Sequence, residues 1–156
     1  MLLSTQKFMN ILKILGIVAG AATVGIAGLA VANLGNVAET TENHQEENLR
    51  QRKYKTNLQS FIAELEKLIP MLTSYGQNWK FVSAAAAENS GVVKAEIPVV
   101  VFTDDLEIKA EYDAETGETT VNIRSASRVG NSDFGENRRH LLQILRALDE
   151  KFLTEN

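Results

Sequence analysis

The residues best suited to chemistry lie in one segment near the C-terminal end of the chain. The segment combines two arginines, two serines, two glycines, one acid and one amide: Arg124, Ser125, Ser127, Arg128, Gly130, Asp133, Gly135 and Asn137. Two guanidinium groups can hold a phosphate or carboxylate through paired N–H donors, and a helix that begins nearby offers backbone N–H groups to the same anion. One hypothesis is therefore an anion or headgroup site, which Asp133 at the helix start would oppose.

A second hypothesis for the same segment is a structural corner between a strand and a helix. On this interpretation Arg128 pairs with Asp133, the glycines permit a tight turn, and Asn137 ties the corner by hydrogen bonds. Alternate residues of a strand share a face, so the two arginines point one way and the two serines the other. The sequence leaves both hypotheses open.

Recognisable catalytic patterns are missing from the sequence. His44 is expected in an exposed loop, His140 on a helix surface, and the acids Asp104 and Asp105 exposed at a strand start. The chain has no cysteine, which excludes disulfides, thiolate zinc sites and a thiol nucleophile. No phosphate loop, nucleotide fingerprint or zinc spacing occurs. We therefore expect no catalytic residue, metal site or cofactor; an enzyme whose residues meet only in space is an alternative.

A second charged group precedes the first expected helix. Residues 49–56 carry four basic side chains: Arg50, Arg52, Lys53 and Lys55. They form either a basic patch that faces anionic lipid or a partner, or a charged edge strand, which discourages aggregation.

Hydrophobic spacing predicts two helices that position these residues. Apolar residues recur at helical intervals over residues 58–72, with Thr56 as the cap and Pro70 ending or kinking the helix. The last helix is expected to begin at Asp133, with Glu136 completing a reciprocal capping box.

Alternating apolar and polar residues predict strands between the helices. The expected strands cover residues 79–86, 92–102, 106–112 and 120–128. Their short connections favour antiparallel pairing. The expected fold class is α+β: an antiparallel sheet of four or five strands with two helices on one face, preceded by one N-terminal transmembrane helix. The expected divisions are a membrane anchor or signal segment (1–34), an acidic linker (35–48) and the α+β domain (49–156).

An uncharged stretch from Ile14 to Ala32 follows Lys7 and Lys13. As a helix it is long enough to cross a bilayer core of roughly 30 Å, and the lysines are expected to stay cytoplasmic with the domain on the far side. The alternative is a cleaved signal peptide with a small-residue processing site at its end. The rest of the chain is acidic and the net charge is −4, which argues against nucleic acid as a partner.

The segment 124–137 also carries a family resemblance. It is similar to the C-terminal signature of the domain of unknown function 1499 family of bacterial and plastid proteins, which reads Arg-Ser-x-Ser-Arg-x-Gly-x-x-Asp-x-Gly-x-Asn. All eight residues listed above match that pattern. The resemblance covers about residues 49–153, including Trp79 and the Asp104-Asp105 pair, but lacks the proline- and cysteine-containing segment with which many members begin. The resemblance implies a fold but no established activity. Through its cyanobacterial and chloroplast members it also implies a thylakoid or plasma-membrane setting.

These observations predict a non-catalytic, membrane-anchored accessory or interaction protein on the extracytoplasmic or luminal side. It is expected to span the membrane once, with a cytoplasmic N-terminus. Its expected partners are the membrane and a larger membrane protein complex, a photosynthetic one if the host is photosynthetic. The alternative from another class is a small apolar-ligand carrier for a lipid or pigment, because a curved sheet that grips a helix can leave a cavity.

Overall fold

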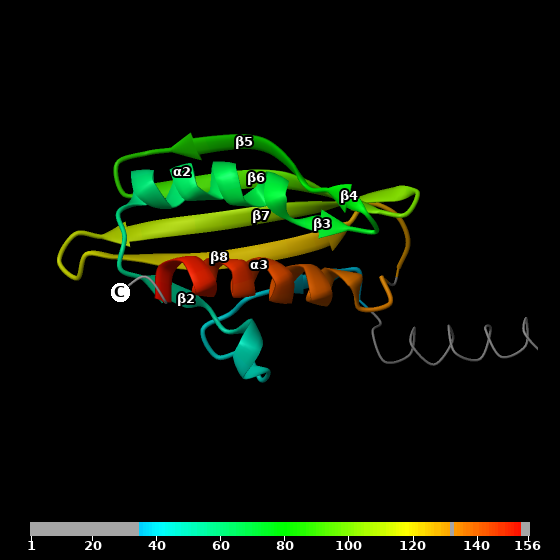
Figure 1. The fold of residues 1–156 in the computed structure, drawn as a ribbon. Helices are drawn as coiled ribbons and strands as arrows, with labels where there is room; N and C mark the ends of the chain where they lie inside the picture. Colours follow the sequence, from blue (N-terminus) through cyan, green and yellow to red (C-terminus); the bar gives the residue numbers. More distant parts are fainter. Residues whose placement is uncertain (1–34, 132, 154–156) are drawn as a thin grey trace, which may run out of the picture.

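The computed structural model describes residues 35–131 and 133–153, which form one main sheet with two α-helices on one of its faces (Figure 1). The predicted α+β class is confirmed. The elements in chain order are β1 (Val37–Glu39), the 3₁₀ turn η1 (Glu47–Leu49), β2 (Arg52–Tyr54), α2 (Leu58–Leu68), the 3₁₀ turn η2 (Ile69–Met71), β3 (Thr73–Ser74), β4 (Gln77–Asn78), β5 (Lys80–Ala86), β6 (Ser90–Val99), β7 (Phe102–Asp113), β8 (Glu118–Ser127) and α3 (Glu136–Leu153).

The main sheet has six strands in the order β1-β8-β7-β6-β5, with β2 also on β8. The sequence predicted four or five. The difference arises because β1 and β2 are only three residues each and share one edge: β1 pairs with one part of β8 and β2 with another. All strand pairs are antiparallel, as their short connections require. Strands β3 and β4 form a separate small hairpin.

The apolar core lies between the sheet and the helices. Alternate residues of β6, β7 and β8 point inward, so Val93, Ile108 and Ile123 stand side by side across the three strands and are buried. Gly91 allows α2 to approach β6 closely, because a Cβ at this position would lie 2.9 Å from Ile62 Cδ1. This close contact fixes α2 over β6.

Each helix buries one apolar stripe. Helix α2 buries Leu58, Phe61 and Leu65, as its spacing predicted. Its cap is Asn57, whose side chain accepts a hydrogen bond from the Ser60 amide at 2.8 Å, and not Thr56 as predicted. The α-helix ends before the 3₁₀ turn that contains a proline, which cannot donate to the helical ladder. Helix α3 buries the residues Leu141, Ile144, Leu145 and Leu148.

The segment predicted as an acidic linker, residues 35–48, instead contributes to the sheet. Val37 lies opposite Ala126 in the β1–β8 pair, and Thr40 is buried with its hydroxyl accepting from the Ile123 amide at 2.8 Å. The segment is held through backbone and hydroxyl hydrogen bonds along the edge of β8. Such bonds leave no hydrophobic periodicity, which is why the sequence pattern indicated a linker.

No helix within residues 35–131 and 133–153 is long and apolar enough to cross a membrane. The predicted membrane anchor or signal segment, residues 1–34, lies outside the described residues.

Candidate functional site

The two arginines of the segment 124–137 lie exposed on the outer face of the sheet. Arg128 Nη2 contacts Glu96 Oε1 at 2.7 Å and Asp105 Oδ1 at 2.6 Å, and these carboxylates raise the pKa of the guanidinium. The predicted pairing with Asp133 is wrong, because Arg128 points to acids on its own face of the sheet. Arg124 shares that face, so the arginines do not converge on the helix start, and the predicted anion site is not assembled.

The serines of the same segment point inward and form the corner that the second hypothesis described. Ser125 Oγ donates to Asn137 Oδ1 at 2.6 Å. The Asn137 Nδ2 group donates to Ser127 Oγ and to the carbonyl of Asn36, both at 2.9 Å. Asn137 is buried, and it ties together the end of β8, the start of α3 and a residue of the N-terminal region.

Asp133 caps α3 as predicted. Its carboxylate oxygens accept from the Gly135 amide at 2.9 Å and the Asn137 amide at 2.8 Å. The reciprocal half of the predicted capping box is not formed, because the Glu136 side chain turns toward Tyr75 and is hydrogen-bonded by its hydroxyl. Gly135 has a positive φ of 84°, a conformation that a glycine adopts without strain.

The first described residues dock on this corner. The Asn36 side-chain amide donates to the Gly130 carbonyl at 3.0 Å, and the Ser127 amide donates to the Asn36 carbonyl at 2.8 Å. The Asp133 amide approaches the Gly35 carbonyl at 3.4 Å. The chain therefore enters the domain at the end of the sheet where β8 leads into α3.

Two residues predicted at the surface are buried beside this corner. Asp104 and His140 are each only 2% exposed. Asp104 continues the inward face of β7, so it points into the core while Asp105 points out. His140 Nδ1 lies 3.6 Å from Asp104 Oδ2 and 3.4 Å from Ser125 Oγ, and His140 Nε2 lies 3.7 Å from Glu136 Oε2. Both surface predictions are wrong.

Burial shifts the two groups in opposite directions. It raises the pKa of the Asp104 carboxyl, aided by the negative charges of Asp133 and Asp105. Burial lowers the pKa of His140 to about 4, aided by the positive charge of Arg139, so the imidazole is neutral near pH 7. Asp104 Oδ2 and His140 Nε2 make no hydrogen bond with any described residue. Buried polar atoms in this state are uncommon and call for an explanation.

Asp104 lies at an open pocket of about 360 Å³. The pocket is lined by Tyr75, Val99, Phe102, Asp104, Ser127, Val129, Gly130, Asp133, Phe134 and Glu136. Its walls are mostly aromatic and aliphatic, and its charged lining residues, among those described, are all acids. A volume in this range, with apolar walls and a few polar groups, is typical of small-molecule sites.

The backbone around the pocket is strained. Within the described residues, a positive φ occurs at three residues other than glycine: Tyr75 (51°), Val100 (55°) and Phe134 (53°). Tyr75 and Phe134 line the pocket, and Val100 lies in the turn between β6 and β7 that supplies Val99 and Phe102. Such conformations are costly for bulky residues and cluster at functional sites.

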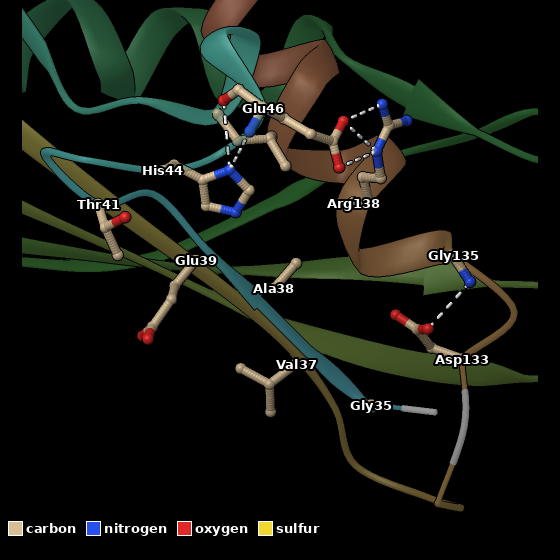
Figure 2. Close-up of a pocket in the computed structure, with 11 residues that line it drawn as sticks. Gly35, Val37, Ala38, Glu39, Thr41, His44, Glu46, Asp133, Gly135 and Arg138 are labelled. Atoms are coloured by element: carbon tan, nitrogen blue, oxygen red, sulfur yellow. Dashed lines mark hydrogen bonds and ion pairs between the residues drawn. The ribbon is translucent and has the colours of Figure 1, made fainter. Parts of the chain in front are cut away.

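A second pocket lies between residues 35–49 and the start of α3 (Figure 2). Its charged groups compensate one another. Arg138 Nε donates to Glu46 Oε2 at 2.9 Å, which lowers the pKa of that carboxyl, and the Glu46 amide donates to His44 Nδ1 at 3.0 Å. These contacts hold the N-terminal segment on α3, so the pocket has a structural explanation.

The predicted basic patch is dispersed along β2 and its flanks. Arg52 Nε contacts Asp149 Oδ2 at 3.3 Å, Arg50 Nη1 contacts Glu47 at 3.5 Å, and Lys55 Nζ lies 4.0 Å from Glu118. Strand β2, which also carries Lys53, lies at an edge of the sheet and pairs with β8 alone. These residues therefore fit the hypothesis of a charged edge strand, and they do not form a single basic surface.

The fold and the pocket define a small α+β domain with one apolar, acidic site at the end of its sheet. Among the described residues, no group of histidines and acids is arranged to hold a metal ion. A family model described as "Protein of unknown function (DUF1499)" matches residues 29–148, and the chain belongs to this family. No curated protein matches the sequence.

Proposed function

We propose that the protein is a non-catalytic accessory domain, tethered to a membrane by its N-terminal segment and working with one end against the bilayer. A group of exposed apolar side chains gathers at that end: Tyr75, Val100, Val101, Phe102, Val129 and Phe134, here called the apolar end. The observation that carries the proposal is that the chain enters the domain at the same place, since Asn36 is bonded to Gly130 beside the pocket.

The distance along the chain supports this orientation. The apolar run that ends at Ala32 is separated from Gly35 by residues 33–34 alone, so a lipid span that ends there brings the apolar end to the headgroup boundary. Val101 is 81% exposed and Phe102 54%. Side chains of this kind gain free energy when they are buried at the boundary between headgroups and acyl chains, and a gathered apolar surface marks an interaction site.

The buried polar groups support a non-catalytic role. Ser125, His140 and Asp104 lie together, but the Ser125 hydroxyl is buried and hydrogen-bonded to Asn137. A nucleophile must reach its substrate and be oriented toward its base. Ser125 instead uses its hydrogen to hold the corner.

Site-specific labelling of the full chain in phosphatidylcholine vesicles tests the orientation. The chain has no cysteine, so Val101→Cys and Ala114→Cys each create one labelling site, the second in the β7–β8 turn at the opposite end of the sheet (Figure 1). An environment-sensitive dye at position 101 is expected to be quenched by spin-labelled lipid and at position 114 to remain unquenched. Equal quenching at both positions would contradict the proposed orientation.

The same variants test the sidedness and the accessory role. A membrane-impermeant maleimide is expected to label Ala114→Cys in host vesicles whose extracytoplasmic or luminal face is outward, and not in vesicles whose cytoplasmic face is outward. Mild solubilisation followed by native electrophoresis is expected to place the chain in a larger membrane protein complex. Labelling only in vesicles with the cytoplasmic face outward would contradict the expected sidedness, and migration as a free monomer would contradict the accessory role.

A further inference from the structure

The main sheet has two edges, and they differ in how well they are protected. The first edge consists of β1 and β2, strands of three residues each, and basic side chains lie along and beside β2. The second edge is β5 (Lys80–Ala86), which pairs with β6 alone. From Phe81 to Ala87 the chain has no charged residue and no proline. Short strands, charges and prolines are the devices by which natural edges avoid pairing with another strand, so β5 is the less protected edge.

The free side of β5 presents unpaired backbone groups. The Ala87 amide donates to the Ser90 carbonyl at 2.8 Å, so this residue faces β6. Because alternate residues of an antiparallel strand turn their backbone groups to opposite sides, Ala84 and Ala86 direct theirs away from β6. The register of β5 on β6 shifts once, near the start of β5, and is regular over residues 83–86. All four of these residues are exposed, so this part of β5 is open to one further strand.

The charges at the two ends of β5 make the strand complementary to itself. In an antiparallel pair centred on Ala84, Lys80 of each copy comes to Glu88 of the other, so an opposite-charge contact flanks the pair at both ends. Glu88 is exposed in the β5–β6 turn, and the Lys80 side chain remains 72% exposed in its contact with Glu96. The bulky residues 81–82 of one copy lie opposite alanines of the other, which leaves room for both. Opposite charges and well-packed side chains across neighbouring strands stabilise their pairing.

We propose that β5 is an interface at which a second copy of this chain adds its own β5 in the antiparallel direction, so that the two sheets become one. This pairing sets the relative direction of the copies. Lys80 lies opposite Glu96 on the side of the apolar end, and Ala86 lies opposite Gly91 on the side of the β7–β8 turn (Figure 1). An antiparallel pair reverses one copy, so the two apolar ends lie at opposite ends of the joined sheet.

The reversal has a consequence for membranes, and this step rests on the proposed function, whereas the pairing itself does not. If each apolar end faces a bilayer, the paired copies belong to two membranes that face each other. Val93 lies opposite Ala84 and precedes Val99, at the apolar end, by six residues. At about 3.3 Å per residue, the centre of the pair lies about 20 Å from each apolar end. The two membrane surfaces are therefore expected about 40 Å apart, roughly the length of one domain.

Single cysteines in the full chain test the pairing, because the chain has none of its own. In detergent micelles, mild oxidation is expected to link Ala84→Cys chains as dimers, since the Cα atoms of a hydrogen-bonded antiparallel pair lie about 5.5 Å apart, within reach of a disulfide. Ala114→Cys, in the β7–β8 turn, is the matched control and is expected to remain monomeric. A mixture of Lys80→Cys and Glu88→Cys chains is expected to give mainly the mixed disulfide. Equal linking at positions 84 and 114, or none at 84, would overturn the proposal.

Sedimentation velocity of the full chain in the same micelles measures the affinity of the pair. Ala84→Lys sets two lysines opposite each other and is expected to weaken the dimer about ten-fold or more. Lys80→Glu is expected to weaken it about five-fold, and Lys80→Glu combined with Glu88→Lys is expected to restore it, because the charges are exchanged. A cooperative urea transition in each variant checks that it folds. A wild-type chain that stays monomeric, or an unchanged dimer in Ala84→Lys, would sink the interface.

Vesicles separate this inference from the proposed function. Phosphatidylcholine vesicles that carry the full chain are expected to cluster, as measured by dynamic light scattering, and vesicles that carry Ala84→Lys are expected not to. A dimer in micelles without clustering would keep the pairing and contradict the membrane-facing end. No dimer, with lipid quenching confined to position 101, would discard the pairing and keep the orientation. Quenching is measured in the Ala84→Lys background, since in paired copies the β7–β8 turn of one lies toward the bilayer of the other.

Discussion

Both ends of α3 have an acid near aromatic side chains, but only at one end is the acid fully paired and are the rings buried. At the C-terminal end, which we call the aromatic end, Tyr54 OH donates to Asp149 Oδ1 at 2.8 Å and Arg52 contacts the same carboxylate. The rings of Tyr54, Phe61 and Phe152 pack with centroids 5.2–6.1 Å apart. At the apolar end an acid also lies near aromatic side chains, but Asp104 has a free oxygen and the rings are exposed.

The two ends differ in what their contacts contribute to the free energy of folding. At the aromatic end every named polar group is paired and the rings are enclosed, so the contacts there contribute to folding. At the apolar end, a buried unpaired carboxyl oxygen and three residues with positive φ each cost free energy. Costs concentrated at one place indicate that the place is kept for something other than stability.

The largest expected effect is at the aromatic end. Phe61→Ala removes a fully buried ring that packs against both Tyr54 and Phe152 and is expected to lower the free energy of unfolding by about 3–5 kcal/mol. Urea denaturation followed by Trp79 fluorescence, the one tryptophan of the chain, measures the change. Phe102→Ala, a ring 54% exposed at the apolar end, is the matched control and is expected to change stability far less. Similar losses would contradict the contrast between the ends.

The second effect is a dependence of stability on pH that comes from His140. Its pKa of about 4 in the folded state lies below its ordinary value of 6.5, so the unfolded chain binds the proton more readily. The charged groups near the imidazole are Asp104 from β7, Asp133 from the turn before α3, and Glu136 and Arg139 from α3. The stabilisation is full above pH 6.5 and is lost as pH falls toward about 4, by about 3 kcal/mol.

Unfolding measurements between pH 4 and pH 7 check this dependence. His140→Phe, which keeps a ring against Trp79, is expected to flatten the decline. A decline of the same size in the variant would assign the pH effect to other groups. Asp104 acts in the opposite sense, because a raised pKa gives stability that is present at low pH and is lost as pH rises through that pKa.

The third prediction compares the same substitution at both ends. Asp149→Asn removes the charge that holds Arg52 and is expected to cost about 1–3 kcal/mol. Asp104→Asn replaces a buried acid that has one unpaired oxygen with a neutral amide and is expected to raise the free energy of unfolding at pH 7 by about 1 kcal/mol. Chemical denaturation of both variants measures whether each substitution raises or lowers the free energy of unfolding. Loss of stability in both would show that Asp104 has a structural role.

The smallest expected effect is on the dispersed basic residues. Arg50→Gln removes an exposed pair with Glu47 and is expected to change the free energy of unfolding by less than about 0.5 kcal/mol. Vesicle binding by the full chain is expected to be unchanged, because these residues form no single basic surface. A marked loss of binding to anionic vesicles would restore the predicted basic patch.

The sequence pattern contains part of the site. The alternation that predicts an inward Leu106, Ile108 and Ala110 places Asp104 on the same face if it is extended by one step. Extending the buried stripe of α3 back by one turn from Ile144 likewise reaches His140. Their residue types predict the surface, because polar residues are usually exposed, whereas their positions in the two periodic patterns predict burial.

The sequence by itself determined the α+β class, the meander from β5 to β8, the two amphipathic helices and the cap at Asp133. These depend on periodicity and on contacts between near neighbours in the chain, which local residue types specify. The tertiary structure alone decided that Asn36 joins a corner 94 residues away at Gly130, that Arg128 turns to the outer acids, and that Tyr75, Phe102, Asp104 and Phe134 surround one pocket. Those contacts depend on which surfaces pack together when the helices cover the sheet, and the local sequence pattern does not specify that packing.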